Sequence, residues 1–463
     1  MKQIKMNLDF GREAEEICRI LRRHNYECYI VGGAVRDKLL GKEPHDIDFA
    51  TNATPDEIER VFQEEGCKTY PTGKQYGTIT VTCDGEHFFE ITTYRGEKYI
   101  RGTRKPIVTW AESIEEDLSR RDFTINAMAY DPIEKVLIDP FGGYEDLKKG
   151  VIRAVGRPEE RFKEDPLRIF RMCRFASTLH FNIDERTFEG AKRVVDELSW
   201  IPKERMTEEF KKAFTKSDKP SLFVNCLVET GAMKYYIPEI YDTIGVEQPP
   251  PHMETVYEHL LLTTDNIKTR DYELRMAGLL HDIGKPKVKR KEKPYFPKHE
   301  EVSAKMAEKI LERTRHSRRA IDKVVKLIKT HMILWHRKPK DDLQARRTLR
   351  SLAKEKLPKG LLDEYLELVE ADAKATLGLS EKEFDEIMKS IELVRKWRNI
   401  PADRKELAIT GSDLVEMGVE PRCIGKILEK LVDYVVDDPT RNTREVLLRK
   451  ARVLAKSIGC LKK

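Results

Sequence analysis

Two aspartates, Asp46 and Asp48, have the residue type and the spacing of a metal-binding pair. Side chains two residues apart on a strand point to the same face, so the two carboxylates would lie side by side. Paired carboxylates offer the hard oxygen ligands with which proteins hold Mg²⁺ together with the phosphates of a substrate. The alternative for an isolated Asp-x-Asp is a solvated strand end. The sequence therefore predicts a catalytic Mg²⁺ site at this pair.

A candidate for a third carboxylate lies on a later strand. Residues 79–94 alternate apolar and polar side chains around Asp84-Gly85, a pattern typical of a β-hairpin. The second strand of this hairpin carries Glu90. The sequence leaves open whether Glu90 is a third carboxylate of the metal site or part of a solvated strand face.

A glycine pair precedes the aspartates and follows the short apolar strand predicted for residues 28–31. Gly32 and Gly33 would let backbone N–H groups come close to phosphates, and Arg36 lies in the helix-forming run behind them. Further along, Arg120, Arg121, Asp122 and Asn126 form a second polar cluster. An arginine fork donates two hydrogen bonds at once and suits a triphosphate, and Asn126 could bond a ribose or hold the loop. The alternative is a surface ion-pair cluster.

Charged residues recur every three positions between residues 164 and 176. Asp165, Arg168, Arg171 and Arg174 would therefore lie along one broad face of a helix. An ionised aspartate can only accept hydrogen bonds and an arginine can only donate them. An Asp–Arg pair fits the exocyclic amine and ring acceptor of cytosine or adenine, and it mismatches guanine and uracil. Each group left unpaired costs roughly 1–3 kcal/mol. The alternative is a salt-bridge ladder on a solvated helix.

Histidines concentrate in the second half of the chain. Seven of the eleven fall between His252 and His336, far more than an even spread would place there. Neutral imidazoles combined with carboxylates suit a transition metal. The predicted ligands of a second metal site are His259, His281, Asp282, His299, His331 and Asp372. His316, like His252 and His336, is expected on the surface. The alternative is a helical RNA-binding body whose histidines carry no chemistry.

These motifs resemble the signature of the polymerase-β-type nucleotidyltransferases, in the branch of the CCA-adding tRNA nucleotidyltransferases and bacterial poly(A) polymerases. The family pattern of Gly-Gly, x-x-Arg-Asp, Leu-Leu-Gly and Asp-x-Asp is matched in residues 32–48. The run Arg-Arg-Asp-Phe-Thr-Ile-Asn-Ala at 120–127 and Glu-Asp-x-x-Arg at 164–168 match two further motifs. The run His-Asp-Ile-Gly-Lys at 281–285 resembles the HD-domain metal-dependent phosphohydrolases.

The resemblance implies template-independent addition of C, C and A to the 3′ end of tRNA from CTP and ATP, with release of pyrophosphate. Residues 96–106 resemble the flexible loop of enzymes that add all three nucleotides, and residues 204–212 resemble a motif expected to brace the neck. The implied nucleotide-binding residues are Gly32, Gly33, Arg36, Arg120, Arg121, Asp122, Asn126, Asp165, Arg168, Arg171 and Arg174. The alternatives are a poly(A) polymerase, an enzyme that adds only part of CCA, or, in another class, an HD-type phosphohydrolase acting on RNA ends or nucleotides.

The sequence predicts that these residues are positioned by a small mixed α/β head followed by helices. This arrangement is an α+β fold. Amphipathic helices are predicted over residues 8–24 and from Thr54 onward, and strand signals end near Lys148. The resulting division has four parts. They are a nucleotidyltransferase head at 1–143, a helical neck at 144–215, a helical body at 216–400 with an HD domain at about 250–375, and a tRNA-binding tail at 401–463.

Composition limits the protein class. Of 463 residues, 36% are charged and 40% are hydrophobic, which indicates a helix-rich globular protein, and the net charge of +6 permits an RNA partner where basic residues cluster. The eight cysteines show no C-x-x-C pair, which argues against a disulfide framework and for a reducing compartment. We find no signal peptide and no apolar run near the ~20 residues that a membrane helix needs. We therefore expect a cytoplasmic protein, a monomer or homodimer, that binds the acceptor stem and elbow of tRNA.

Overall fold

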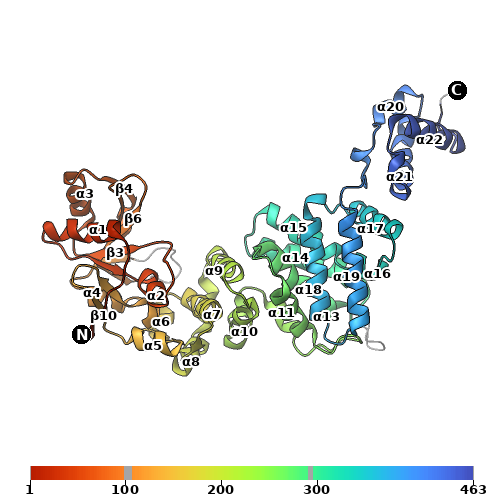
Figure 1. Ribbon diagram of the computed structural model, residues 1–463. Coiled ribbons are helices and arrows are strands. Elements are labelled where there is room, and N and C mark those ends of the chain that lie inside the picture. Colours follow the sequence, from red (N-terminus) through yellow and green to blue (C-terminus); the bar gives the residue numbers. More distant parts are fainter. Residues whose placement is uncertain (1, 99–106, 290–295, 462–463) are drawn as a thin grey trace. The chain divides into compact units, whose positions relative to one another are not determined.

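An eight-stranded mixed sheet organises the head in the computed structural model, which describes residues 2–98, 107–289 and 296–461 (Figure 1). The strand order is β1-β10-β9-β2-β3-β6-β5-β4, with β3 and β6 parallel and the other neighbours antiparallel. The strands are β1 Lys2–Lys5, β2 Tyr29–Val31, β3 Asp48–Thr51, β4 Lys68–Gly73, β5 Thr78–Thr82, β6 Phe89–Thr93, β9 Ala129–Asp131 and β10 Val136–Asp139.

Helices flank the sheet and make up most of the remaining chain. The first set comprises α1 Arg12–Arg23, α2 Gly33–Leu39, α3 Pro55–Glu64, α4 Ile114–Ser119, α5 Gly143–Lys149, α6 Pro158–Glu164, α7 Leu167–Leu179, α8 Glu185–Arg193, α9 Lys203–Lys216 and α10 Pro220–Thr230. The second set comprises α11 Val256–Asn266, α12 Tyr272–Leu280, α13 Lys285–Val288, α14 His299–Arg313, α15 Arg318–Thr330, α16 Met332–Arg337, α17 Asp342–Lys354, α18 Leu362–Ala375, α19 Glu381–Lys396, α20 Gly411–Glu416, α21 Pro421–Asp437 and α22 Arg444–Ser457. The α+β prediction is confirmed.

Local sequence explains the elements that frame the head motifs. Helix α3 begins with a capping box in which Thr54 and Glu57 satisfy each other's backbone N–H groups. Strands β5 and β6 form the predicted hairpin. Strand β3, however, begins at Asp48, so Asp46 lies just before the strand, whereas we expected both aspartates within it.

Two small ladders were not predicted. Strands β7 (Arg95–Lys98) and β8 (Ile107–Trp110) pair antiparallel, and the predicted mobile loop between them falls largely on residues 99–106, outside the described part of the chain. Strands β11 (Val151–Ile152) and β12 (Asn182–Ile183) pair parallel beyond Lys148, where we expected no strand. Both ladders are too short to leave a periodic signal in the sequence.

The chain divides into two compact units. One contains residues 1–213 and 217–236, and the other contains residues 214–216 and 237–463. Helix α10 therefore groups with the head and neck, although the predicted neck ended at residue 215. The four-part division remains a prediction. None of the described helices has both the length and the apolar character that a membrane crossing requires.

The expectation about cysteines is wrong. Disulfides join Cys67 to Cys83, Cys173 to Cys226 and Cys423 to Cys460, while Cys18 and Cys28 are buried free thiols. The partners are 16, 53 and 37 residues apart in sequence, so tertiary packing rather than local spacing brings them together. Sequence spacing alone does not reveal such connectivity.

Candidate active site and metal centre

The strand register places the predicted carboxylates together at one end of the sheet. Asp48 opens β3, and its partner on the parallel strand β6 is Glu90. Asp46 lies two residues before Asp48, and all three residues are exposed. Val31, the last residue of β2, pairs with Asp48 from the other side, so the glycine turn that follows β2 begins beside the aspartate. One edge of the sheet therefore carries both the carboxylates and the glycines.

Electrostatics at this edge favour a cation. Partial burial and the nearby charge of Glu90 raise the pKa of Asp48, Arg121 opposes the rise, and Asp46 adds to it. A nearby cation would counteract the effect of the neighbouring carboxylates on Asp48 and favour its charged form. The donor set of three carboxylates also fits the oxygen preference of Mg²⁺. The residues present therefore fit a divalent metal ion.

The glycine turn accommodates an arginine at close range. Gly32 has φ 73°, and a Cβ built on it would lie 2.7 Å from Nη1 of Arg121. The backbone conformation of this position favours glycine, and any larger residue would also displace the guanidinium of Arg121. Arg121 is in turn held by Asp117, which also receives hydrogen bonds from Arg120. Burial alone would raise the pKa of Asp117, but the charges of Arg121 and Arg120 outweigh it and keep the pKa low.

Two predicted nucleotide-binding residues are buried in a hydrogen-bond network. Asp122 accepts from Arg171 Nε at 2.7 Å and from Asn126 Nδ2 at 3.0 Å. Asn126 Oδ1 accepts from Arg36 Nη1 at 2.7 Å. The network thus connects α2, which follows the glycine turn, to the predicted base-reading helix α7. Asp122 and Asn126 are each 6% exposed, so their contacts position Arg36 and Arg171.

An aromatic ring completes this connection. Phe175 of α7 lies under three guanidinium groups, with Arg174 at 4.1 Å, Arg36 at 5.1 Å and Arg171 at 5.4 Å from the ring centroid. Its edge packs against Phe123, which follows the Arg-Arg-Asp motif. Cation–π contacts of this kind hold cations in place without neutralising them. Nothing in the local sequence around Phe175 predicts this role beyond its apolar type.

The predicted base-reading pair is not a direct pair in this structure. Asp165 is buried and accepts from Arg205 Nη2 at 2.9 Å and Nη1 at 3.3 Å. Arg168 donates instead to the carbonyl of Arg161 at 3.0 Å, to Glu164 at 2.9 Å and to the carbonyl of Arg120 at 2.8 Å. Both side chains are therefore fixed separately, and Arg168 is tied to the head.

Helix α9 contains the whole segment expected to brace the neck, and it contacts Asp165 just before α7 and Arg174 within α7. Asp165, expected on the same helix as the three arginines, lies between α6 and α7. Arg205 bonds Asp165, and Glu209 accepts from Arg174 Nε at 2.5 Å. Arg174 is 8% exposed, so its guanidinium is committed to this ion pair inside the neck. Of the four predicted readers, Arg171 keeps the most exposed side chain, at 32%.

The Asp122–Arg171 bond gives a prediction about stability. Replacing Asp122 by asparagine should destabilise the protein by about 3 kcal/mol near pH 7, because it leaves Arg171 facing a neutral group in a buried site. Burial opposes ionisation, but Arg171 and Asn126 outweigh it and lower the pKa of Asp122. A carboxylate with a lowered pKa stabilises above its unfolded value of about 4, and this contribution is lost as the pH falls below that. The gap between wild type and Asp122→Asn should therefore shrink below pH 4.

Chemical denaturation at pH 7, 5 and 3 measures this gap. Asp385→Asn, at an exposed position of α19, is the matched control and should change the unfolding free energy little at any pH. A gap that stays constant between pH 7 and pH 3 would contradict the assignment.

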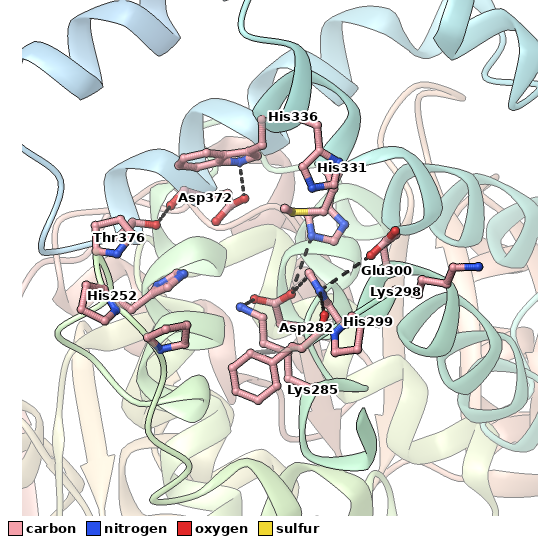
Figure 2. Close-up of a pocket in the computed structure, with 17 residues that line it drawn as sticks. His252, Asp282, Lys285, Lys298, His299, Glu300, His331, His336, Asp372 and Thr376 are labelled. Atoms are coloured by element: carbon pink, nitrogen blue, oxygen red, sulfur yellow. Dashed lines mark hydrogen bonds and ion pairs between the residues drawn. The ribbon is translucent and has the colours of Figure 1, made fainter. Parts of the chain in front are cut away.

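Four of the six predicted ligands of the second metal site line one cavity of the C-terminal unit, namely Asp282, His299, His331 and Asp372 (Figure 2). The other two, His259 and His281, contact this group. His259 Nε2 lies 2.9 Å from Asp372 Oδ1 and 3.2 Å from His281 Nε2. His281 Nε2 lies 3.3 Å from Asp282 Oδ2. The other oxygen of Asp282 faces His299 Nε2 at 3.1 Å and His331 Nε2 at 3.6 Å. Asp282 therefore stands between two pairs of histidines, with one carboxylate oxygen toward each.

Unsatisfied polar atoms make this cluster a candidate metal site. Asp282 Oδ1 and His299 Nε2 are buried and have no hydrogen-bond partner among the described residues, although they approach each other. Buried polar atoms without partners are rare and require an explanation such as a bound ion. Imidazole nitrogens and carboxylate oxygens at these separations suit a transition metal. The residues present fit such an ion.

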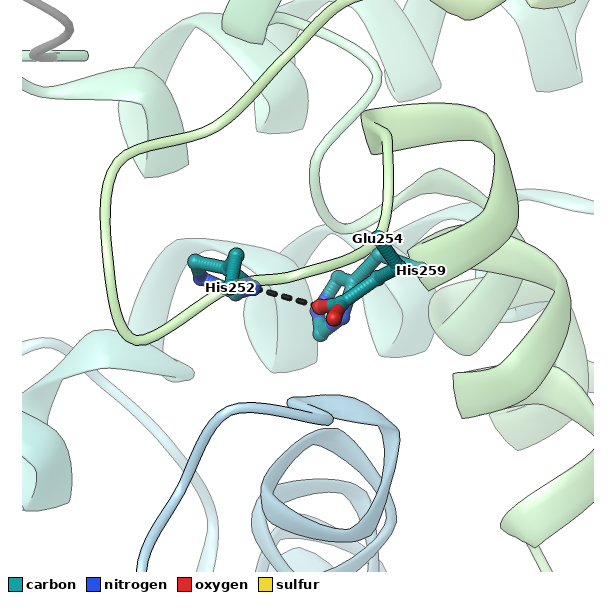
Figure 3. A group of neighbouring side chains, drawn as sticks. All are labelled: His252, Glu254 and His259. Atoms are coloured by element: carbon teal, nitrogen blue, oxygen red, sulfur yellow. Dashed lines mark hydrogen bonds and ion pairs between the residues drawn. The ribbon is translucent and has the colours of Figure 1, made fainter.

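A carboxylate outside the predicted set orients one of the histidines (Figure 3). Glu254 accepts from Nδ1 of His259 at 3.0 Å and from Nδ1 of His252 at 2.6 Å. This contact leaves Nε2 of His259 directed at the cluster, as is usual for metal-binding histidines. Burial alone would lower the pKa of His259, but Asp372 and Glu254 outweigh it and raise the pKa to about 9. His252, expected on the surface, is half-buried in this arrangement.

A cavity of about 390 Å³ opens onto the cluster. Lys285, buried beside it, donates to Asp282 and to Gln248, each at 2.6 Å. Trp335 donates its Nε1–H to Asp372 Oδ2 at 2.8 Å and lines the cavity with Phe296. The sequence singled out Lys285 only as part of the His-Asp motif and a basic run, whose residues 290–293 lie outside the described part of the chain. Trp335 and Glu254 were missed, because nothing in their local sequence marks them.

Three family descriptions match parts of the chain. Residues 28–153 match the Poly A polymerase head domain, and residues 251–376 match the HD domain. Residues 180–243 match a family described as a probable RNA and SrmB-binding site of polymerase A. These matches cover the carboxylate edge and the histidine cluster.

Relatives span more of the chain. A CCA-adding enzyme of Geobacillus sp. (strain WCH70) is 44% identical over 232 residues, which are 50% of this chain and 55% of the relative. For the first two curated relatives the chain thus spans about half of their length. The crystal structure of the Bacillus stearothermophilus CCA-adding enzyme in complex with CTP has a TM-score of 0.65 at 26% identity, covering 96% of this chain and 98% of that one. A CCA-adding enzyme of Levilactobacillus brevis is 31% identical over 443 residues, which are 94% of this chain and 96% of the relative. The sequence, the fold and these matches agree, and the chain belongs to the family of CCA-adding enzymes.

Proposed function

We propose that this protein adds C, C and A to the 3′ end of tRNA from CTP and ATP and releases pyrophosphate. The observation that carries the proposal is the register of β3 and β6, which pairs Asp48 with Glu90 at the edge that holds Gly32. The relative crystallised with CTP supports the nucleotide, and another solved relative, from Thermotoga maritima, was complexed with tRNA.

In this proposal the residues of the head hold the triphosphate against the carboxylate edge. Arg121 reaches over Gly32, and Arg36 is aimed by Asn126. Asp46, Asp48 and, as a third ligand, Glu90 would hold Mg²⁺. Bound Mg²⁺ would activate the RNA 3′-hydroxyl and stabilise the leaving pyrophosphate. Because Arg168 and Arg171 are bonded to the head, the base is read at a fixed distance from the triphosphate.

The further assignments follow from this reaction. The tail at 401–463 would bind the tRNA elbow, and the protein would act in the cytoplasm as a monomer or homodimer. With a cytoplasmic location, the three disulfides would resemble those of intracellular hyperthermophile proteins, which are an exception to the rule that disulfides are rare in the cytosol.

The direct test is incubation of CCA-less tRNA with labelled CTP and ATP, followed by measurement of product lengths. Three added nucleotides in the order C, C, A support the proposal. Addition of two cytidines, of one adenosine or of a long adenosine tail would instead identify one of the related activities.

Base selection gives a prediction for Asp165. Its replacement by alanine removes the carboxylate that would accept from the exocyclic amine of cytosine or adenine. We expect the preference for CTP over UTP to fall by about tenfold or more, as the loss of one buried hydrogen bond implies, while tRNA binding changes little. Competition assays with all four nucleotides measure this, and an unchanged preference would remove Asp165 from base reading.

A second activity is proposed for the histidine cluster, on the ground that six ligand-type residues converge beside an open cavity. A transition metal bound there would supply hydroxide near neutral pH for hydrolysis of a phosphate ester. Lys285 would meet the phosphate, because its buried ammonium lines the cavity next to Asp282. The substrates expected are phosphomonoesters or 2′,3′-cyclic phosphates of RNA ends or nucleotides.

A further inference from the structure

Arg205 is the residue that fixes the carboxylate of Asp165. Its guanidinium forms two parallel bonds, from Nη2 to Oδ2 at 2.9 Å and from Nη1 to Oδ1 at 3.3 Å. A fork of this kind fixes both the position and the plane of a carboxylate. The backbone N–H of Leu167 adds a third bond to Oδ1 at 3.2 Å. The side chain of Asp165 is 9% exposed, so it has little freedom to reorient.

The bonds from Arg205 and Leu167 determine how many further hydrogen bonds the carboxylate of Asp165 can accept. A carboxylate has about four lone-pair sites, two on each oxygen. On Oδ1 both sites are taken, by Arg205 and by the N–H of Leu167. On Oδ2 one site is taken by Arg205, and the contacts among the described residues leave the second site free. A single remaining acceptor matches a single exocyclic amine, and it repels the carbonyl that uracil or guanine offers at the same position.

Arg205 is itself held rigidly. It lies in the first turn of α9, where its N–H donates to the carbonyl of Pro202 at 3.1 Å. The residues that follow anchor the helix, since Met206 and Phe210 are fully buried and Thr207 bonds Tyr236 at 2.7 Å. The Arg205 side chain is 34% exposed and reaches Asp165 from the solvent side. Asp165 itself lies between α6 and α7, so the geometry of its carboxylate depends on Arg205 of α9 together with the N–H of Leu167 at the start of α7.

We propose that Arg205 is a specificity-determining positioning residue, whose fork presents one acceptor site of Asp165 to the amine of cytosine or adenine. The inference rests on the proposed function, because it requires that Asp165 reads a base. It assigns to a segment expected only to brace the neck a part in choosing the nucleotide.

Selectivity measurements test the role. We expect Arg205→Ala to lower the ratio of kcat/KM for CTP to that for UTP by about tenfold, the equivalent of about 1.4 kcal/mol. Arg205→Lys keeps the charge but loses the fork, and it should give an intermediate ratio. Lys211→Ala, on the same helix in an exposed pair with Glu208, is the control and should leave the ratio unchanged. A purely structural role would lower all rates together and leave the ratio intact.

A double-mutant cycle separates a role through Asp165 from any other. In an Asp165→Ala background, Arg205→Ala should not lower the ratio further. An unchanged ratio in Arg205→Ala, or an equal additional fall in the Asp165→Ala background, would overturn the proposal. If the thermal melt shows that Arg205→Ala is unfolded, the test uses Arg205→Lys instead. An unaltered CTP-to-UTP ratio in Arg205→Lys would also overturn the proposal. A wild-type protein that adds no nucleotide to tRNA refutes the proposed function instead, so the two failures are distinct.

Discussion

Asp46→Ala and Asp48→Ala should each abolish nucleotide addition, with single-turnover rates at least about a thousandfold below wild type. Loss of one preorganised hydrogen-bond donor in an active site costs about a hundred- to a thousandfold, and loss of a metal ligand removes more. The expectation rests on Asp48 opening β3 beside Glu90, with Asp46 two residues earlier. Binding of tRNA should stay near wild type, because we propose that the tail at 401–463 binds the elbow.

Glu43→Ala is the matched control. Glu43 lies in the same turn, has the same charge, and pairs on the surface with Lys38 at 2.6 Å. We expect it to retain near-normal addition. Asp48→Asn complements the alanine variants because it keeps the volume and removes the charge. Near-normal incorporation by either aspartate variant, measured with CTP and a tRNA lacking CCA, would show that the metal assignment is wrong.

Sequence patterns revealed the motifs whose chemistry depends on neighbours in the chain. Gly32, Asp46 and Asp48 were identified because the glycine turn, the start of the strand and the spacing of the aspartates all lie within 17 consecutive residues. The family and the α+β fold inferred from these motifs are confirmed by the comparisons. The histidine cluster was predicted from the order of its residues along the chain, and the structure brings these residues together from helices α11, α12, α14, α15 and α18 or their ends. Their role as metal ligands stays a prediction.

Contacts between distant segments were not visible in the sequence. Arg205 is 40 residues from Asp165, and Trp335 is 37 residues from Asp372. Glu254 is only five residues from His259, but nothing in the local sequence marks it as the partner of a histidine. The prediction about the disulfides was wrong for the same reason. A pairing at such separation depends on packing, and no local period encodes it.

Residues of the same motif have different roles in the structure. Asp122 and Asn126 belong to the motif expected to bind the nucleotide, yet both are buried and bonded to the arginines that would do so. Arg174 shares the helix face of the predicted readers but is paired with Glu209. A motif therefore includes residues that position a site as well as residues that would touch its ligand, and only burial and bonding distinguish the two.

The combined change His281→Ala with Asp282→Ala should remove bound transition metal and all hydrolysis of 2′,3′-cyclic nucleotides, while CCA addition stays near wild type. Asp282 has one oxygen toward His281 and the other toward His299 and His331, so its loss dismantles both halves of the cluster. The head carboxylates share no residue with this cluster, which is why addition should persist.

Metal analysis of the purified protein and a cyclic-nucleotide assay across several divalent ions measure the result. His316→Ala is the matched control, because it removes a histidine of the same unit that bonds Tyr272 rather than the cluster, and it should retain metal and turnover. Asp282→Asn tests the same site with unchanged side-chain volume, so a folding defect in the double alanine variant does not obscure the answer. If the wild-type protein binds no metal and hydrolyses no phosphate ester with any ion, the cluster is without chemistry. The helical body would then serve only to hold RNA, and the unpaired Asp282 Oδ1 and His299 Nε2 would need an explanation other than a metal ion.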